Sequence, residues 1–299
     1  MFSLRNLVIL FICVSCNSNN NEPGTPQPQT PNSKPVTSFS YDLAHPSKKW
    51  SLPPELLEIS GITYTDNNHL LAIEDLTPNL YLLNISADKA FIENKIPFRD
   101  SAPGKKFDVE DIAVVNNTAY ALWSHGTVFK ITNWQGGPKV QEIKTFLSKD
   151  NNTEGICYDA DDHVLLVACK NESDVADEKK STRAIFAYDL AGDSLRTEPF
   201  MVIHKSDFKE KTGDKIKFYP SAIAVHPLTH DIYILSTKDT KCLGIFSHSG
   251  QLKSVQYIDK DLMPQPEGIC FSPDGTLFIS TEGKAGGVGV VLKFEEGKE

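Results

Sequence analysis

Several signatures of common enzyme classes are absent from this sequence. The four cysteines that follow residue 16 form no C-x-x-C pair, and with the eight histidines they show no Cys/His spacing typical of a zinc site. No serine or cysteine lies in a nucleophile elbow, and no glycine-rich loop leads from a strand into a helix. No segment has the periodicity of an amphipathic helix. The motifs of zinc, serine-nucleophile and phosphate-loop chemistry are therefore missing.

A basic surface is also lacking. The formal net charge is −9, and no lysine- or arginine-rich stretch is interleaved with aromatic residues. Proteins that bind nucleic acid generally need a positive surface for the phosphates. The composition therefore argues against a nucleic-acid partner.

Long hydrophobic runs are absent, and the longest, at residues 7–12, is too short to span a bilayer. It follows Arg5 and precedes small residues and Cys16, so residues 1–15 are predicted to be a secretory signal peptide. The junction resembles the lipobox of bacterial lipoproteins, in which the cysteine is lipidated. We expect Cys16 to attach the protein to a membrane of the cell envelope, facing the periplasm or the cell surface, with plain secretion as the alternative.

Residues 16–35 form a linker rich in proline and asparagine, with almost no apolar residue that could be buried. An extended linker of this kind would hold the folded domain, predicted over residues 36–299, up to about 60 Å from the membrane. The domain contains Cys157, Cys169, Cys242 and Cys270, all in apolar runs. We interpret them as buried core residues, although an exported protein could also pair them in disulfides.

The same pattern opens a predicted strand five times in the domain. The five openings are Ser60-Gly61-Ile62, Glu110-Asp111-Ile112, Glu154-Gly155-Ile156, Ser221-Ala222-Ile223 and Glu267-Gly268-Ile269. Their spacings of 50, 44, 67 and 46 residues, with short alternating strands between them, are typical of the blades of a β-propeller. The sequence therefore predicts an all-β fold of five four-stranded blades, or six if the longest spacing hides a degenerate blade.

The last repeat has room for only three strands. We expect the alternating segment from Thr37 to Leu43 to supply the missing outer strand and close the ring, which removes open sheet edges. Three polar stretches, at 99–106, 171–182 and 205–217, are interpreted as loops on one face of the propeller. Such loops are either a binding surface or solvated decoration.

The innermost strand of a blade lines the central channel, and its start lies beside the end of the next strand. One mouth of the channel is therefore predicted to collect Glu58, Ser60, Glu74, Asp75, Asp108, Lys170, Ser221, Lys238 and Glu282, together with the repeat-position residues Glu110, Glu154 and Glu267. Carboxylates crowded in this way repel each other unless a cation lies among them. We expect the three glutamates to be metal ligands, or to form a polar network with backbone N–H groups and lysines.

An oxygen-only ligand set favours Ca²⁺, because Ca²⁺ takes six to eight oxygen ligands in flexible geometry. The segment Asp159-Ala160-Asp161-Asp162 also resembles part of the calcium-binding signature of β-propeller phytases. It falls on the face opposite the predicted mouth, and we interpret it as a turn.

The repeat openings, with the flanks Leu57-Glu58-Ile59, Asp108-Val109 and Gln265-Pro266, resemble the SdiA-regulated (YjiK-like) family of bacterial propellers over about residues 50–299. The resemblance implies a cell-envelope propeller related to calcium-linked, phytase-like propellers, with no established catalytic residues. Asp111 replaces a glycine of the motif.

Two functions follow from these observations. The first is a lipid-anchored module that binds Ca²⁺ at the channel mouth and recognises an envelope protein or a small anionic ligand. The alternative is a metal-assisted hydrolase of phosphoesters or lactones, with Arg99, Lys105, Lys106, Lys170 or Lys238 receiving the anion. No nucleophile or base pattern assigns catalytic residues.

Overall fold

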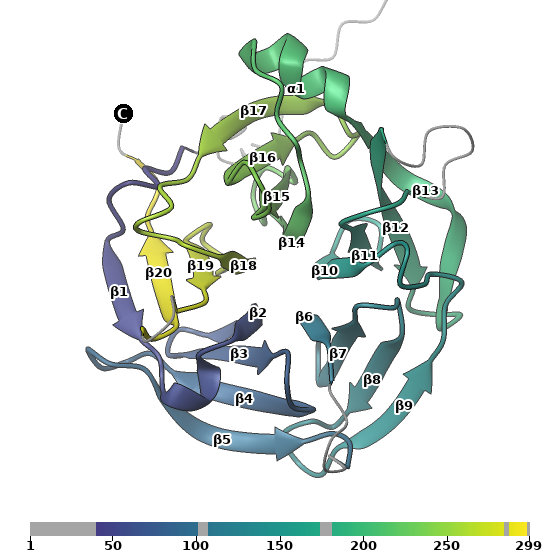
Figure 1. The fold of residues 1–299 in the computed structure, drawn as a ribbon. Helices are drawn as coiled ribbons and strands as arrows, with labels where there is room; N and C mark the ends of the chain where they lie inside the picture. The colour runs from purple at the N-terminus through teal and green to yellow at the C-terminus, as the bar shows by residue number, and fades with distance from the viewer. Residues whose placement is uncertain (1–39, 101–106, 174–180, 284–286, 298–299) are drawn as a thin grey trace, which may run out of the picture. The chain divides into compact units, whose positions relative to one another are not determined.

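The protein is a five-bladed β-propeller, as the repeats predicted (Figure 1). The computed structural model describes residues 40–100, 107–173, 181–283 and 287–297. The five blades are four-stranded antiparallel sheets, and in each the strand that opens the repeat is innermost. Residues 1–39, with the predicted signal peptide, Cys16 and linker, lie outside the described residues. No helix in the described part of the chain is both long enough and apolar enough to span a membrane.

The strands follow the chain from the channel outward. Blade one contains β2 (Ile59–Asp66), β3 (His69–Glu74), β4 (Asn79–Asn84) and β5 (Phe91–Pro97). Blade two contains β6 (Val109–Val115), β7 (Thr118–Trp123), β8 (Val128–Thr132) and β9 (Lys139–Ile143). Blade three contains β10 (Thr153–Asp159), β11 (Val164–Cys169), β12 (Thr182–Asp189) and β13 (Ser194–His204). Blade four contains β14 (Pro220–Val225), β15 (Ile232–Ser236), β16 (Cys242–Phe246) and β17 (Leu252–Tyr257). Blade five contains β18 (Pro266–Phe271), β19 (Leu277–Thr281), β20 (Val290–Phe294) and, as its outer strand, β1 (Lys48–Ser51).

The N-terminal strand closes the ring, but it is not the expected segment. β1 pairs antiparallel with β20, from Lys48 opposite Lys293 to Ser51 opposite Val290. Of the expected strand, residues 37–39 lie outside the described residues, and residues 40–43 contain no strand. Trp50 is the buried residue of β1 and stacks on Phe278 of blade five. The prediction of closure was therefore right, and the prediction of its residues was wrong.

Tyr41 explains why the earlier segment alternates like a strand. Its ring is buried, and its hydroxyl donates to the carbonyl oxygen of Gly275 and contacts Nε2 of His226 at 2.8 Å. Nδ1 of His226 accepts the N–H groups of Leu228 and Thr229, so the proton of the neutral ring lies on Nε2. Burial lowers the pKa of His226 to about 4, which keeps the ring neutral. The N-terminal segment is thus anchored by one buried aromatic residue, not by a strand ladder.

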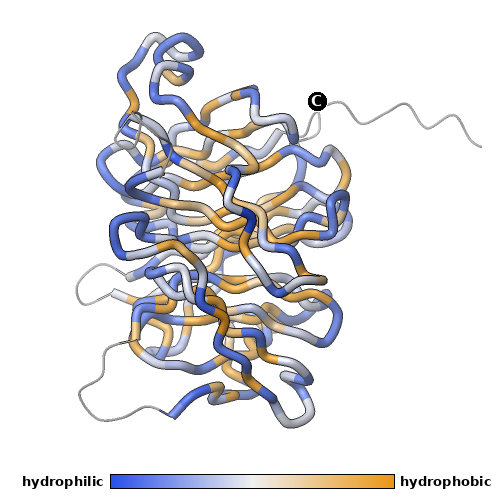
Figure 2. Tube along the Cα trace, turned by 90° about the vertical axis from the view of Figure 1, so that its right-hand side faces the viewer, coloured by the Kyte–Doolittle hydropathy of each residue, from blue (hydrophilic) through white to orange (hydrophobic). Residues whose placement is uncertain are grey.

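The hydrophobic core lies between neighbouring blades. Each of five clusters of buried residues joins two adjacent sheets, for example Val164, Leu166 and Ile185 of blade three with Ile223 and Ile234 of blade four. Figure 2 shows hydrophobic strand segments bordered by hydrophilic turns, as expected for sheets packed face to face. None of the four cysteines of the domain forms a disulfide, and all but Cys157 are buried in this packing, as predicted.

A short helix, α1 (Lys205–Thr212), lies in a stretch that we interpreted as a loop. It ends at Gly213, which has a φ of 81° and donates its N–H to the carbonyl of Lys209. Phe208 is its buried residue and stacks on Phe218 with ring centroids 4.5 Å apart. A helix that buries one side chain has no apolar stripe, so periodicity could not reveal it.

Candidate functional site

A β-bulge begins every innermost strand and sets the geometry of the channel mouth. In each blade the register against the second strand shifts by one residue at this point. The five unpaired residues are Ser60, Glu110, Glu154, Ser221 and Glu267. A bulge re-aims the side chain of its extra residue and often lies beside a functional site. The repeat position in the sequence is therefore the bulge position in the structure.

The residue after each bulge approaches the next blade closely. A Cβ atom on Gly61 would lie 2.6 Å from the Cα of Asp111, and one on Gly155 would lie 3.0 Å from the backbone nitrogen of Ile223. Glycine avoids this contact at both positions, because it has no Cβ atom.

Asp111 takes the place of the motif glycine in blade two, and its side chain occupies the gap between blades two and three. Its carboxylate accepts the N–H of Ile112 at 2.8 Å and, across the blade boundary, the N–H of Ile156 at 2.8 Å. Complete burial raises the pKa of Asp111 well above its ordinary value. The aspartate therefore joins blades two and three instead of disturbing the channel.

Seven carboxyl groups interact at the mouth. We call this group the acidic mouth; it comprises Glu58, Asp75, Asp108, Glu110, Glu154, Glu267 and Glu282. They come from all blades except blade four. Every member repels at least one other member, and this repulsion raises the pKa of one carboxyl group of each such pair. The structure thus brings together the carboxylates that the repeat register predicted. Glu74 also repels Asp75, but we leave it out of this group because its own oxygens are engaged in the turn after β3.

Two of the bulge glutamates, Glu110 and Glu267, have strongly raised pKa values. Burial, followed by repulsion from Glu154 and Asp108, raises the pKa of Glu110 far above its ordinary value. Burial and repulsion from Glu154 and Glu282 raise the pKa of Glu267 to about 8, although Lys170 opposes the shift. In the described part of the chain, the carboxylates of Glu110 and Glu267 accept no hydrogen bond, unlike that of Glu154.

Lys170 provides the main countercharge. Its Nζ lies 2.5 Å from Oε2 of Glu154, and the amide of Asn152 donates to the other oxygen of the same carboxylate. Burial lowers the pKa of Lys170, but the neighbouring carboxylates, Glu154 first, outweigh burial and raise it overall. Glu154 is therefore part of a polar network, the second of the two roles predicted for it. One lysine does not satisfy the whole cluster.

The rim of the acidic mouth is partly compensated. Burial and repulsion from Glu74 and Glu58 raise the pKa of Asp75 to about 6, and its buried Oδ1 has no hydrogen-bond partner in the described residues. Burial and repulsion raise the pKa of Glu282 to about 7, and Gln265 donates an amide hydrogen to its carboxylate. The hydroxyl of Ser124 donates to Asp108.

Other residues predicted at the mouth are engaged elsewhere. Both oxygens of Glu74 accept local hydrogen bonds in the turn after β3, from the N–H of Leu76 and from the hydroxyl of Thr77. Nζ of Lys238 lies over the ring of Tyr219, 5.0 Å from its centroid. The hydroxyls of Ser60 and Ser221 donate to backbone carbonyls.

Some residues near the site were not predicted. Lys241 donates to the carbonyl of Thr237 and interacts electrostatically with Glu267. The buried guanidinium of Arg183 lies 4.6 Å from the ring centroid of Tyr219. Both lie on third strands or the loops before them, so the pairing of first and second strands gave no signal for them.

Basic residues that the hydrolase hypothesis would use are also engaged. Arg99 pairs with Glu142 at 3.2 Å and lies over Trp123 and Phe129. Lys105 and Lys106 lie outside the described residues.

The opposite end of the channel is apolar. A pocket of 310 Å³ lies where the innermost strands end, lined by side chains that include Ile62, Tyr64, Ile156 and Phe271. The channel is therefore strongly asymmetric, with acidic side chains at one end and hydrophobic side chains at the other.

A metal ion at the acidic mouth would have to draw its ligands together. Among the described residues, one group places three potential ligand atoms within 4.8 Å of one another, and it lies elsewhere, at Asp159, Asp162 and His248. The carboxylates of Glu110 and Glu267 accept no hydrogen bond among the described residues, so no such contact opposes their movement onto a cation. Seven oxygen-donating side chains match the ligand type of Ca²⁺.

The comparisons with known proteins bear on fold and family. The chain is similar to the crystal structure of the glutaminyl cyclase of Myxococcus xanthus, with a TM-score of 0.57 and 12% identity over 85% of this chain and 97% of that one. It is also similar to the PQQ-bound aldose sugar dehydrogenase of Streptomyces coelicolor, with a TM-score of 0.55 and 11% identity over 87% and 99% of the two chains. At such identities the likeness concerns the fold alone.

No curated protein is detectably similar in sequence. The model of one family, described as SdiA-regulated, matches residues 51–284, which include all five repeat openings. The match covers most of the propeller, from β1 in blade five through β19 of the same blade. The chain therefore belongs to the SdiA-regulated family.

Proposed function

We propose that this protein is a lipid-anchored module of the cell envelope that binds Ca²⁺ at the acidic mouth and there recognises an envelope protein or a small anionic ligand. The observation that carries the proposal is the excess of carboxyl groups. Seven interact at the mouth, against the buried Lys170 and the nearby Lys241. Carboxylates buried close together are stabilised by taking up protons or by binding a cation. At neutral pH a divalent cation reduces their mutual repulsion more effectively than protonation does.

The proposed anionic ligand would use the cation as its contact. A Ca²⁺ ion held by a few carboxylates keeps coordination positions that are filled by water or by oxygen atoms of a ligand. The mouth alone would repel an anion, whereas the loaded mouth would attract one. Anchoring through Cys16 and the linker would keep this site at the membrane surface.

Calcium binding is tested by calorimetric titration of the full chain after treatment with chelator. We expect heat of binding at micromolar to millimolar Ca²⁺, and at least about tenfold weaker binding in the double variant Glu110→Gln/Glu267→Gln, which removes two bulge carboxylates that accept no hydrogen bond among the described residues. Glu295→Gln is the matched control, because Glu295 is exposed and pairs only with Lys293. No heat at millimolar Ca²⁺, together with no thermal shift on chelation, would contradict the proposal.

Metal-assisted hydrolysis of phosphoesters or lactones is the second candidate. The observation in its favour is that carboxyl groups with raised pKa values, such as Glu267 and Glu282, gather at one site, as in many active sites. A group with a pKa near 7 can act as a general acid. The bound cation would activate water, and Lys170 would help to hold the anion.

This candidate is tested by assaying the purified chain with Ca²⁺ against phosphomonoesters, phytate and lactones. We expect any genuine activity at this site to fall at least about a hundredfold in Glu282→Gln, which removes the proton donor. The matched control is again Glu295→Gln. Activity that is unchanged in Glu282→Gln and in Glu110→Gln would place the reaction elsewhere.

A further inference from the structure

Two carboxylate–imidazole pairs join blades three and four on the face opposite the acidic mouth. In the first, Nε2 of His248 lies 2.8 Å from Oδ2 of Asp159. In the second, Nδ1 of His230 lies 2.6 Å from Oδ2 of Asp161. Asp159 is the last residue of β10 and Asp161 lies in the turn before β11, while both histidines belong to turns of blade four. The pairs are far apart in sequence, and the first joins residues 89 positions apart.

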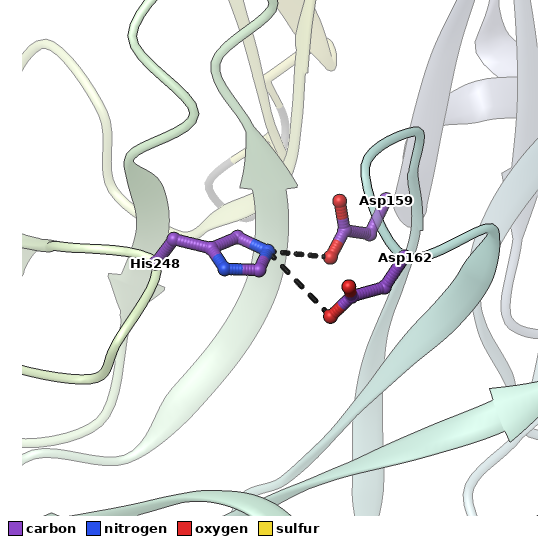
Figure 3. Close-up of side chains that lie close together, drawn as sticks. All are labelled: Asp159, Asp162 and His248. Carbon is purple, nitrogen blue, oxygen red and sulfur yellow. Dashed lines mark hydrogen bonds and ion pairs between the residues drawn. The ribbon is translucent and has the colours of Figure 1, made fainter. Parts of the chain in front are cut away.

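A third carboxylate completes the first pair. Oδ2 of Asp162 lies 4.0 Å from Nε2 of His248, and the three potential ligand atoms of Asp159, Asp162 and His248 lie within 4.8 Å of one another. Figure 3 shows the imidazole pointing between the two carboxylates. Two ligands of a tetrahedral zinc ion lie about 3.4 Å apart, given bonds of about 2.0–2.1 Å. The two observed separations fall on either side of this value, so small shifts would suffice.

The supporting structure holds these groups in place. Asp159 is fully buried at the end of β10, and its Oδ1 accepts the N–H of Asp161 at 3.1 Å, which leaves Oδ2 directed at His248. The ring of Phe200 meets that of His248 edge-on, with centroids 5.4 Å apart. Asp162 and His248 remain partly exposed, with 47% and 31% of their side-chain surfaces accessible, so an ion can enter from solvent.

We propose that Asp159, Asp162 and His248 form a binding site for a divalent transition-metal ion, of which Zn²⁺ is the best match, at the junction of blades three and four. One imidazole nitrogen with two carboxylate oxygens suits zinc and its first-row neighbours, whereas Ca²⁺ and Mg²⁺ prefer oxygen alone. On binding, the ion takes the lone pair of Nε2, and any proton there passes to solvent. Three protein ligands leave the fourth position of tetrahedral zinc to water. Such an ion would bind the two blades together independently of the acidic mouth.

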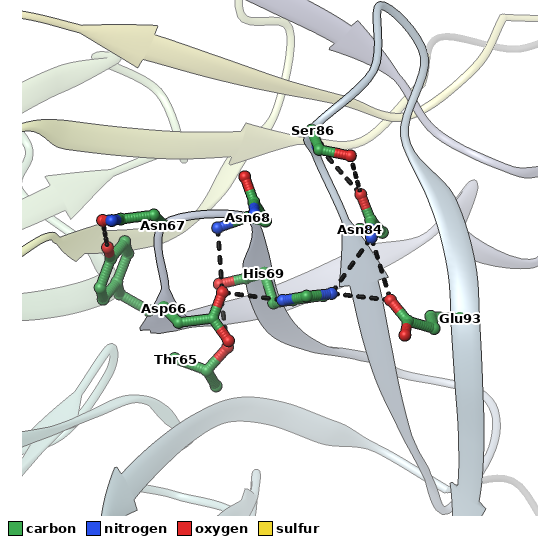
Figure 4. A network of polar contacts seen from close by, with 9 residues as sticks. Thr65, Asp66, Asn67, Asn68, His69, Asn84, Ser86 and Glu93 are labelled. Atoms are coloured by element: carbon green, nitrogen blue, oxygen red, sulfur yellow. Dashed lines mark hydrogen bonds and ion pairs between the residues drawn. The ribbon is translucent and has the colours of Figure 1, made fainter.

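A second histidine network serves as the control. His69 contacts Asp66 through Nδ1 and Glu93 through Nε2, both at 2.7 Å, and Asn84 donates to the same Glu93 carboxylate (Figure 4). The two carboxylates lie on opposite sides of the ring, so they cannot share one ion with a single nitrogen. His69→Gln therefore removes a histidine of similar charge environment without removing a ligand of the proposed site.

The proposal is tested with the full chain, treated with chelator and titrated with Zn²⁺ in a calorimeter at millimolar Ca²⁺, which saturates any calcium site. We expect one zinc site, at least about tenfold weaker in His248→Gln and in Asp162→Asn and unchanged in His69→Gln. Asp162→Asn leaves the contact between Asp159 and His248 intact, so it tests the site without weakening the blade junction. Zinc X-ray absorption of the loaded protein should show one imidazole with oxygen ligands.

Two results would overturn the proposal. The first is that His248→Gln and Asp162→Asn bind zinc as tightly as the unchanged chain does. The same conclusion follows if neither the unchanged chain nor the variants bind zinc. The other is sulfur in the absorption spectrum, which would place the ion on cysteine.

Discussion

Replacing Asp111 by alanine is expected to lower the free energy of unfolding by about 3 kcal/mol, one of the largest single-residue effects outside the hydrophobic core. The carboxylate of Asp111 accepts the backbone N–H groups of Ile112 and Ile156, and both donors are buried between blades two and three. An unpaired buried N–H costs about 1–3 kcal/mol, and alanine leaves two of them. Urea unfolding at pH 7, followed by circular dichroism, measures the loss.

Asp42→Ala is the matched control for this experiment. Asp42 also accepts a backbone N–H, that of Ala44 at 3.0 Å, and contacts a neighbouring histidine, but its side chain is 64% exposed. Water replaces the lost acceptor there, so we expect a change within about 0.5 kcal/mol. A loss below 1 kcal/mol in Asp111→Ala, with an unchanged slope against urea, would show that Asp111 does not join the blades.

The blades could be predicted because one local sequence pattern begins the innermost strand of all five blades. The bulge glutamates and the glycines that follow them stand at one position of the repeat, since both are required by the geometry around the channel. The closing strand could not be predicted in the same way. β1 has a single buried residue, Trp50, whereas the alternation around Tyr41 reflects an anchored side chain. Strand-like periodicity in a sequence indicates that alternate side chains are buried, and a segment can bury side chains in this way without pairing in a β-sheet.

The acidic mouth was predictable in its members and not in its balance of charge. Register alone places Glu110, Glu154 and Glu267 at one end of the channel. Lys170 pairs with Glu154, whereas Lys238 lies over Tyr219. These contacts depend on side-chain rotamers, which the local sequence does not determine. His248 was beyond reach for another reason, because its partner Asp159 belongs to a different blade. Turn aspartates are so common that only the tertiary contact distinguishes this one.

Without divalent cations, the thermal stability of the protein is expected to fall as the pH rises from 5 to 8. The pKa values of Asp75, Glu282 and Glu267, at about 6, 7 and 8 in the folded protein, exceed those of ordinary carboxyl groups. In this range the folded state therefore binds more protons than the unfolded state, and stability decreases with increasing pH. The stabilising contribution is complete below about pH 4 and is lost as each folded pKa is passed. A loss of about 2 kcal/mol corresponds to a decrease in Tm of roughly 4–8 °C.

Calcium should reverse this loss, because an ion held at the acidic mouth replaces the protons. We expect Ca²⁺ to raise the Tm by several degrees at pH 8 and by almost nothing at pH 5, where Asp75, Glu282 and Glu267 are already largely protonated. In Glu110→Gln/Glu267→Gln both the slope against pH and the effect of Ca²⁺ should shrink, because neutral amides replace two carboxyl groups whose pKa values are raised by burial and repulsion. Glu295→Gln changes an exposed glutamate and should leave both quantities as they are. Equal stabilisation by Ca²⁺ at pH 5 and pH 8 would separate calcium binding from the ionisation of these glutamates, and the acidic mouth would then not be the calcium site.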